Sequence, residues 1–177
     1  MNDLRHEPTY LGYSSVRRDQ PDGTPITVLH IGPTLTRLVF GKDMMAEVTF
    51  SLDIGSQKTS SDHFKHTPPT PNEMENAIMS VEDEIAQAPA SLLAGSNLFT
   101  NDAAIREIAQ MAGLADQTVM NFGLTEVEIT FDRLVSVLQG RPASSEGLPV
   151  SPEFAATLLI LREFMHHLKF PSIAVVN

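Results

Sequence analysis

The sequence contains no cysteine, no long apolar run and few cations, and each of these shortages excludes a class of protein. Without cysteine the chain can form neither disulfides nor thiolate metal sites, so its stability must come from packing. No segment approaches the about 20 apolar residues of a membrane-spanning helix, and we expect a cytoplasmic protein that contacts no membrane. Twelve Lys and Arg stand against 22 Asp and Glu, and the net charge of −10 argues against nucleic acid as a partner.

Length and composition favour one folded domain preceded by an arm. A chain of 177 residues buries about 70% of its unfolded surface on folding, which is enough for one core. Residues 1–25 are polar, contain three prolines and show no sustained period, which predicts a flexible N-terminal arm. The folded domain is therefore expected to span residues 26–177.

The stretch Ile26–Gly41 predicts two strands joined by a tight turn. Apolar and β-branched residues fill both of its arms, and Gly32-Pro33 interrupts them. A third strand is expected over Ala46–Ile54, because apolar and polar side chains alternate there. The core of the domain thus opens with three consecutive strands.

Helix signals follow the three strands. One or two helical turns are expected within Gly55–Lys65. Thr70, Pro71 and Glu73 have the spacing of a capping box with proline at the first helical position. A helix should therefore run from Pro71 to Gln87, and its expected core face is Met74, Ile78, Val81 and Ile85.

The rest of the chain alternates short apolar runs with capped segments. We expect a buried strand over Ser91–Ala94, a helix from a cap at Asn101 or Asp102 to Met111, extended pieces at Thr118–Asn121 and Glu126–Ile129, a helix from Thr130 to before Gly140, a largely buried helix over Ser151–Leu168, and a strand over Ser172–Val176. This order predicts an α/β fold with a mixed sheet, in which three antiparallel N-terminal strands precede parallel strands and helices cover both faces.

That order is also the order of a ribonuclease H-like half, the unit of the actin, sugar kinase and Hsp70 superfamily. A more specific similarity is carried, in order, by VLHIGPTLTRLVFG, SLDIGSQKTSSDHF, TPPTPNEMENAI, IREIAQMAG and LPVSPEFAATLLILREFMHHLKFPSIAVV. These segments resemble the phosphate loop, the following strand end, a proline-led helix, an arginine-containing helix and the closing helix and strand of the exopolyphosphatase and guanosine pentaphosphate phosphatase family. The resemblance concerns the second domain of that family and implies an actin-like ATPase half with a phosphate loop between its first two strands.

The segment that matches the phosphate loop departs from the family's Asp-Ile-Gly-Gly-Gly-Ser-Thr-Glu pattern. With Gly32 as the shared anchor, His30 stands for the aspartate and Arg37 for the glutamate, while Pro33 and Thr34 stand for two glycines. Pro33 has no N–H to give to a phosphate, and Thr34 adds a Cβ where the backbone should approach one. The carboxylates that would hold a metal or a water are also replaced. The resemblance therefore implies a degenerate phosphate loop.

Two loops form the candidate ligand site, which we interpret as vestigial. The first comprises His30, Gly32, Thr34, Thr36 and Arg37, and the second, by the resemblance, comprises Gly95, Ser96, Asn97 and Thr100. Whether His30 and Arg37 form a new anion site or are ordinary strand residues stays open, the latter being favoured. We predict no catalytic residue, no metal ligand and no cofactor here, except Mg²⁺ if the domain hydrolyses phosphate.

Other polar clusters have simpler explanations. Asp62, His63 and His66 suggest a metal, but no strong ligand pattern surrounds them and a solvated loop is favoured. His166 and His167 are adjacent, so on a helix they point about 100° apart, and we interpret them as surface or helix-end residues. The acidic residues Glu73, Glu75, Glu82, Asp83 and Glu84 are interpreted as a solvated helix face.

Two main functional hypotheses follow. In the first, this is a stand-alone exopolyphosphatase-related domain, a pseudoenzyme that has lost hydrolysis and serves binding or assembly, with a second copy or a separate first-domain chain as partner. In the alternative, it is a polyphosphate or guanosine pentaphosphate phosphohydrolase, hence a phosphoric anhydride hydrolase, completed by another chain or by dimerisation. A plain structural relic, with an apolar patch that dimerisation buries, is also open.

Overall fold

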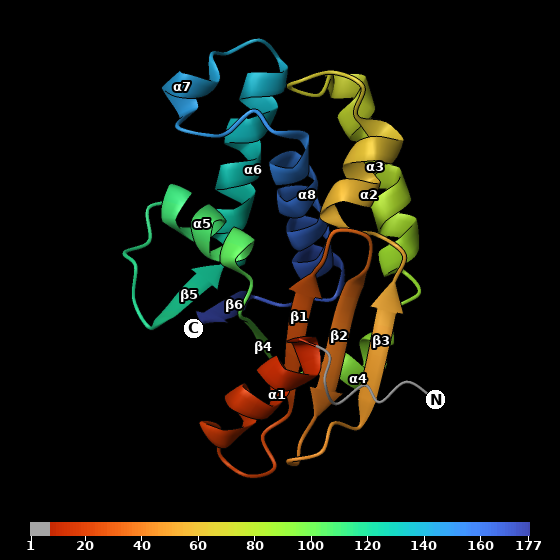
Figure 1. The fold of residues 1–177 in the computed structure, drawn as a ribbon, viewed down its shortest axis with the longest axis vertical. Helices are drawn as coiled ribbons and strands as arrows, with labels where there is room; N and C mark the ends of the chain where they lie inside the picture. The colour runs from red at the N-terminus through yellow and green to blue at the C-terminus, as the bar shows by residue number, and fades with distance from the viewer. Residues whose placement is uncertain (1–7) are drawn as a thin grey trace.

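The computed structural model describes residues 8–177, which fold around one six-stranded sheet in the order β3-β2-β1-β4-β6-β5 (Figure 1). The strands are β1 (Ile26–Ile31), β2 (Thr36–Gly41), β3 (Val48–Leu52), β4 (Asn97–Thr100), β5 (Val119–Gly123) and β6 (Ser172–Val176). The helices are α1 (Pro8–Arg18), α2 (Ser56–His63), α3 (Pro71–Ile85), α4 (Ala90–Leu93), α5 (Ala103–Met111), α6 (Leu124–Leu138), α7 (Ala143–Glu146) and α8 (Pro152–His167). The predicted α/β class is confirmed.

The sheet directions follow the prediction except at one edge. β1 pairs antiparallel with β2, and β2 with β3, so the three N-terminal strands are confirmed. β4 lies parallel to β1, and β6 lies parallel to β4, as expected of strands added by crossovers. β5, however, runs antiparallel to β6 and forms the other edge of the sheet. Its alternation of buried and exposed side chains indicates a strand but does not fix its direction.

The predicted strand over residues 91–94 is wrong. Residues 91–93 belong to the single-turn helix α4, which Pro89 precedes and Gly95, at φ +77°, follows. The strand of this region, β4, begins only at Asn97. A short apolar run fits a buried strand and a buried helical turn equally well, so periodicity could not separate the two.

The predicted extended piece at residues 126–129 is also wrong, because these residues lie inside α6. The Thr130 hydroxyl does not cap a helix but donates to the Glu126 carbonyl at 2.8 Å, a bond made inside the helix, one turn back. The end of this helix before Gly140 is confirmed.

α8 is the most buried helix of the domain. It packs against α2, α3, α5 and α6 and contacts β1. Its buried residues are Ala155, Ala156, Thr157, Leu158, Leu159, Ile160, Leu161, Glu163, Phe164 and Met165. A helix that is apolar on most sides has to be covered by other elements, and this prediction is confirmed. Within the described residues, no helix is long and apolar enough to cross a membrane.

α3 begins with the predicted capping box. The Thr70 hydroxyl accepts from the Glu73 N–H, and a Glu73 carboxylate oxygen accepts from the Thr70 N–H at 2.8 Å. This N–H, followed by His66 and the Lys65 N–H as further donors, lowers the pKa of Glu73 to about 2. The buried face is Met74, Ala77, Val81 and Ile85, with Ile78 partly exposed. The cap therefore fixes where α3 starts and its apolar residues fix which face it buries.

α1 lies within the segment that the sequence predicted to be a flexible arm, and that expectation fails for residues 8–18, which form a helix. Tyr13, Val16 and Arg17 are buried. The Arg17 guanidinium donates to the carbonyls of Thr24 at 2.6 Å and Lys42 at 3.1 Å, so its charge is met by backbone oxygens. These three positions have the i, i+3, i+4 spacing of a helix face, but one of them is a charged arginine and the segment is polar overall, which hid the helix. Residues 1–7 of the predicted arm lie outside the described part.

Candidate functional site

The β1–β2 turn, where the resemblance places a phosphate loop, has few backbone donors to offer. The Gly32 N–H donates to the Leu35 carbonyl at 3.0 Å inside the turn. Pro33, next in the chain, has no N–H. Two of the amides that a phosphate loop would direct at an anion are thus consumed or missing.

The carbonyls of this turn are bound by the first amides of α2. The Ser56 N–H donates to the Gly32 carbonyl at 3.0 Å, and the Gln57 and Lys58 N–H groups donate to the Pro33 carbonyl at 2.9 and 3.0 Å. A helix N-terminus is otherwise an anion-binding position, because its first N–H groups have no partner within the helix. Here the turn itself satisfies them, so they are not available to a phosphate.

Gly55 allows this close approach. A Cβ built on it would lie 2.6 Å from the Gly32 carbonyl oxygen and from the carbonyl group of Pro33. Its φ of −162° is extended backbone, so glycine is needed for space and not for backbone conformation. The turn and the start of α2 are therefore packed backbone against backbone.

A buried carboxylate stands beside the turn. Asp102, the N-cap residue of α5, lies with one oxygen 2.5 Å from His30 Nδ1, and its other oxygen accepts from the Ile31 N–H at 2.7 Å. Where the carboxylate oxygen is the acceptor of this bond, the ring N–H is at Nδ1. Nε2 lies on the Gly32 side, 3.4 Å from where a Cβ of that residue would be. The geometry orients one imidazole at the mouth of the turn.

Sequence reasoning named Asp102 only as a helix cap. Its side chain makes no capping hydrogen bond, while its own N–H donates to Thr100 Oγ1 at 3.1 Å. The misplaced strand at residues 91–94 put the end of the real strand, Thr100, inside a loop. A correct β4 would have shown an aspartate two residues past the carboxyl end of a strand parallel to β1, next to His30.

The other residues of the first candidate loop differ in their surroundings. Thr36 is buried, and its hydroxyl donates to the Ile54 carbonyl at 2.9 Å. Arg37 lies opposite His30 in the β1–β2 register and is partly exposed. Thr34 is exposed at the tip of the turn. A ligand at these positions stays a prediction.

The second candidate loop is divided by the structure. Gly95, Ser96 and Asn97 lie before or at the start of β4, where Asn97 pairs with Ile26 at the end of the sheet opposite His30. The Ser96 hydroxyl donates to the Leu93 carbonyl at 2.7 Å. Only Thr100 reaches the end of the sheet where the turn lies. The segment that joins β4 to α5 is Asn101–Asp102.

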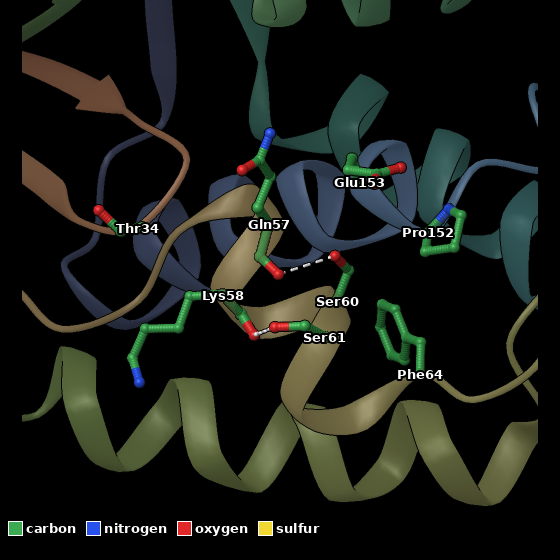
Figure 2. A pocket seen from close by; sticks show the side chains of 8 residues that line it. All are labelled: Thr34, Gln57, Lys58, Ser60, Ser61, Phe64, Pro152 and Glu153. Carbon is green, nitrogen blue, oxygen red and sulfur yellow. Dashed lines mark hydrogen bonds between the residues drawn. The ribbon is translucent and has the colours of Figure 1, made fainter.

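A groove of about 630 Å³ opens beside the turn (Figure 2). It is lined by Thr34, Gln57, Lys58, Ser60, Ser61, Phe64, Pro152 and Glu153. The hydroxyls of Ser60 and Ser61 donate back to carbonyls of α2 at 3.0 Å. The Lys58 ammonium lies 3.3 Å from Asp62 and 3.6 Å from Asp53, and the hydrogen bond to Asp62 raises the pKa of this lysine. Lys58, the cation among the described lining residues, is thus already balanced by carboxylates.

The suspected metal cluster of Asp62, His63 and His66 is not brought together. Asp62 pairs with Lys58 at 3.3 Å, whereas His66 Nδ1 lies 2.8 Å from Glu73. Within residues 8–177, three convergent ligand groups are found elsewhere, at Glu82, Glu163 and His167.

Solved structures with a similar fold are known. A Ppx/GppA enzyme of Aquifex aeolicus superposes with a TM-score of 0.74 at 18% identity, over 93% of this chain and 57% of that one. Another Aquifex aeolicus structure of the Ppx/GppA family gives 0.71 at 17% identity, over 98% and 63%. An exopolyphosphatase from Cytophaga hutchinsonii gives 0.69 at 15% identity, over 93% and 57%. The chain has the Ppx/GppA fold.

The match is one of fold, and it covers only part of each neighbouring structure. The chain spans between 55% and 63% of the lengths of these Ppx/GppA neighbours. No protein-family model matches the sequence, and no curated protein is significantly similar to it. The similarity therefore confirms the predicted fold, while the chemistry of the site has to be argued from this chain's own residues.

Replacing Gly55 by alanine tests the packing of the turn on α2. The added Cβ meets backbone atoms at 2.6 Å, so the Gly55→Ala variant should lose about 1–3 kcal/mol of unfolding free energy. Urea denaturation measures this loss. The control is Ser80→Ala on the exposed face of α3, expected to change stability by less than about 0.5 kcal/mol. Equal stability of the Gly55→Ala variant and the wild type would contradict the packing.

Proposed function

We propose that this domain is a Ppx/GppA-fold module that does not hydrolyse phosphoanhydrides and serves binding and assembly. The observation that carries the proposal is the engagement of Ser56, Gln57 and Lys58 N–H groups by the carbonyls of Gly32 and Pro33. A phosphoryl-transfer site depends on donors aimed at the charge of the transferred group. Here those donors hold the fold together.

The side chains at the turn support the same conclusion. Magnesium prefers oxygen ligands, and its sites in phosphate chemistry include one or two carboxylates. His30 and Arg37 stand where the resemblance expects carboxylates. The remaining carboxylate, Asp102, is buried and satisfied by His30 and the Ile31 N–H. Asp102 is therefore not an accessible metal ligand, and at the two positions where the resemblance expects carboxylates the chain has His30 and Arg37.

The alternative, a phosphohydrolase completed by a second chain, is favoured by one feature. The Asp102–His30 pair orients an imidazole as a general base is oriented in other hydrolases. A second chain would have to supply the phosphate donors and the metal ligands.

A phosphate-release assay with polyphosphate and guanosine pentaphosphate, in the presence of Mg²⁺, distinguishes these functions. We expect no release above a no-protein blank. Release that is abolished by His30→Ala and unaffected by the control His63→Ala would contradict the proposal. It would support the phosphohydrolase alternative.

The proposed assembly surface is the part of the sheet face beside α1. α1 contacts β1 and β2, and next to it two adjoining hollows of about 160 and 330 Å³ share Gln20, Phe99 and Val119 as lining residues. Val119 is 48% exposed on the edge strand β5. Apolar side chains on an edge strand suit the contact of two copies, because a two-fold axis can bring the same strand of each copy together.

Light scattering tests this assembly. The wild type is expected to have the mass of a dimer, and Val119→Asp is expected to have the mass of a monomer, because a charge would enter the apolar contact. Ile129→Asp is the control, since Ile129 is 55% exposed on α6 and outside the proposed surface. A wild type that stays monomeric at high micromolar concentration would refute dimerisation through this face.

A further inference from the structure

Three potential metal ligands converge at the contact between α3 and α8, away from the turn. Glu82 is on α3, and Glu163 and His167 are one turn apart on α8. Their ligand atoms lie within 4.8 Å of one another. The groove beside the turn is lined by the first residues of α8, and His167 is its last, about 20 Å further along the helix axis. The cluster is therefore separate from the site described above.

Glu163 gives this cluster a fixed, buried ligand. Glu163 is only 1% exposed. One of its oxygens accepts from the Arg162 guanidinium, which stacks on the Phe131 ring at 4.8 Å from the centroid. The other oxygen lies 3.4 Å from His167 Nε2. Arg162 thus holds the carboxylate with its second oxygen directed at the cluster.

The two distances from His167 Nε2 to the carboxylate oxygens fit ligands of one metal ion, and the two oxygens lie within 4.8 Å of each other. Glu82 Oε1 and Glu163 Oε2 lie 3.2 and 3.4 Å from the same atom, His167 Nε2. A neutral imidazole has one N–H to donate and cannot bond both carboxylates well at once. With metal–ligand bonds of about 2.1 Å, neighbouring ligands of a tetrahedral ion lie about 3.4 Å apart.

We propose that Glu82, Glu163 and His167 form a divalent transition-metal site, with zinc as the best-suited ion. Carboxylate oxygens and imidazole nitrogen are zinc ligands, and three protein ligands leave a position for water. Two carboxylates and a neutral imidazole carry two negative charges, one of which Arg162 already offsets. The bound ion joins α3 to α8 and stabilises their contact. This site is independent of the proposed function.

Zinc titration of the chelator-treated full chain tests the site. Calorimetry should show one zinc per chain, and zinc should raise the thermal unfolding midpoint, because it binds the folded state. Glu82→Gln and His167→Ala should each weaken zinc binding by about tenfold or more. Glu82 is partly exposed, so its variant is expected to fold, which circular dichroism verifies.

The chain provides a matched control. His166 precedes His167 and lies 3.4 Å from a single carboxylate, Glu128, so His166→Ala should bind zinc as the wild type does. His66→Ala serves the same purpose for the exposed pair with Glu73. Absence of zinc binding, or binding that survives both Glu82→Gln and His167→Ala, would overturn the proposed site.

Discussion

The hydrogen bonds between the β1–β2 turn and the first turn of α2 are the constraint on which the rest of this structure depends. Backbone amides at a helix N-terminus need acceptors, and the Gly32 and Pro33 carbonyls supply them. The absence of a side chain at Gly55 makes the approach possible. An amide that donates to a carbonyl of the fold would have to give up that bond to bind an oxyanion, and the proposed loss of phosphate binding rests on this competition.

Side chains at the turn are joined by hydrogen bonds around that corner. Asp102, in the connection between β4 and α5, bonds both the His30 ring and the Ile31 backbone N–H. Thr36 donates to the Ile54 carbonyl just before α2. A set of hydrogen bonds thus ties β1, β2, β4 and α2 together at the turn. The chain has the Ppx/GppA fold, and at this turn these hydrogen bonds join its elements.

The sequence predicted those elements whose signals are local. Period-2 alternation located the first three strands, and the capping box located α3 within two residues. Elements that depend on tertiary contacts were missed. α1 is held by a buried arginine and backbone carbonyls, and α4 is a four-residue run without period. The wrong strand at residues 91–94 also affected the predicted site. Because it misplaced β4, the prediction did not bring Asp102 next to His30. The cluster of Glu82, Glu163 and His167 brings together residues of two helices, and Glu82 and Glu163 are 81 positions apart in the sequence. No spacing rule predicts such a contact.

The central claim is tested most directly by following the backbone amides themselves. In a ¹⁵N-resolved NMR titration with pyrophosphate and Mg²⁺, the resonances of Gly32, Ser56, Gln57 and Lys58 report on any anion at the turn. Since these N–H groups are bonded to carbonyls of the fold, their chemical shifts should stay unchanged at millimolar pyrophosphate. Saturable shifts confined to these four amides would contradict the account.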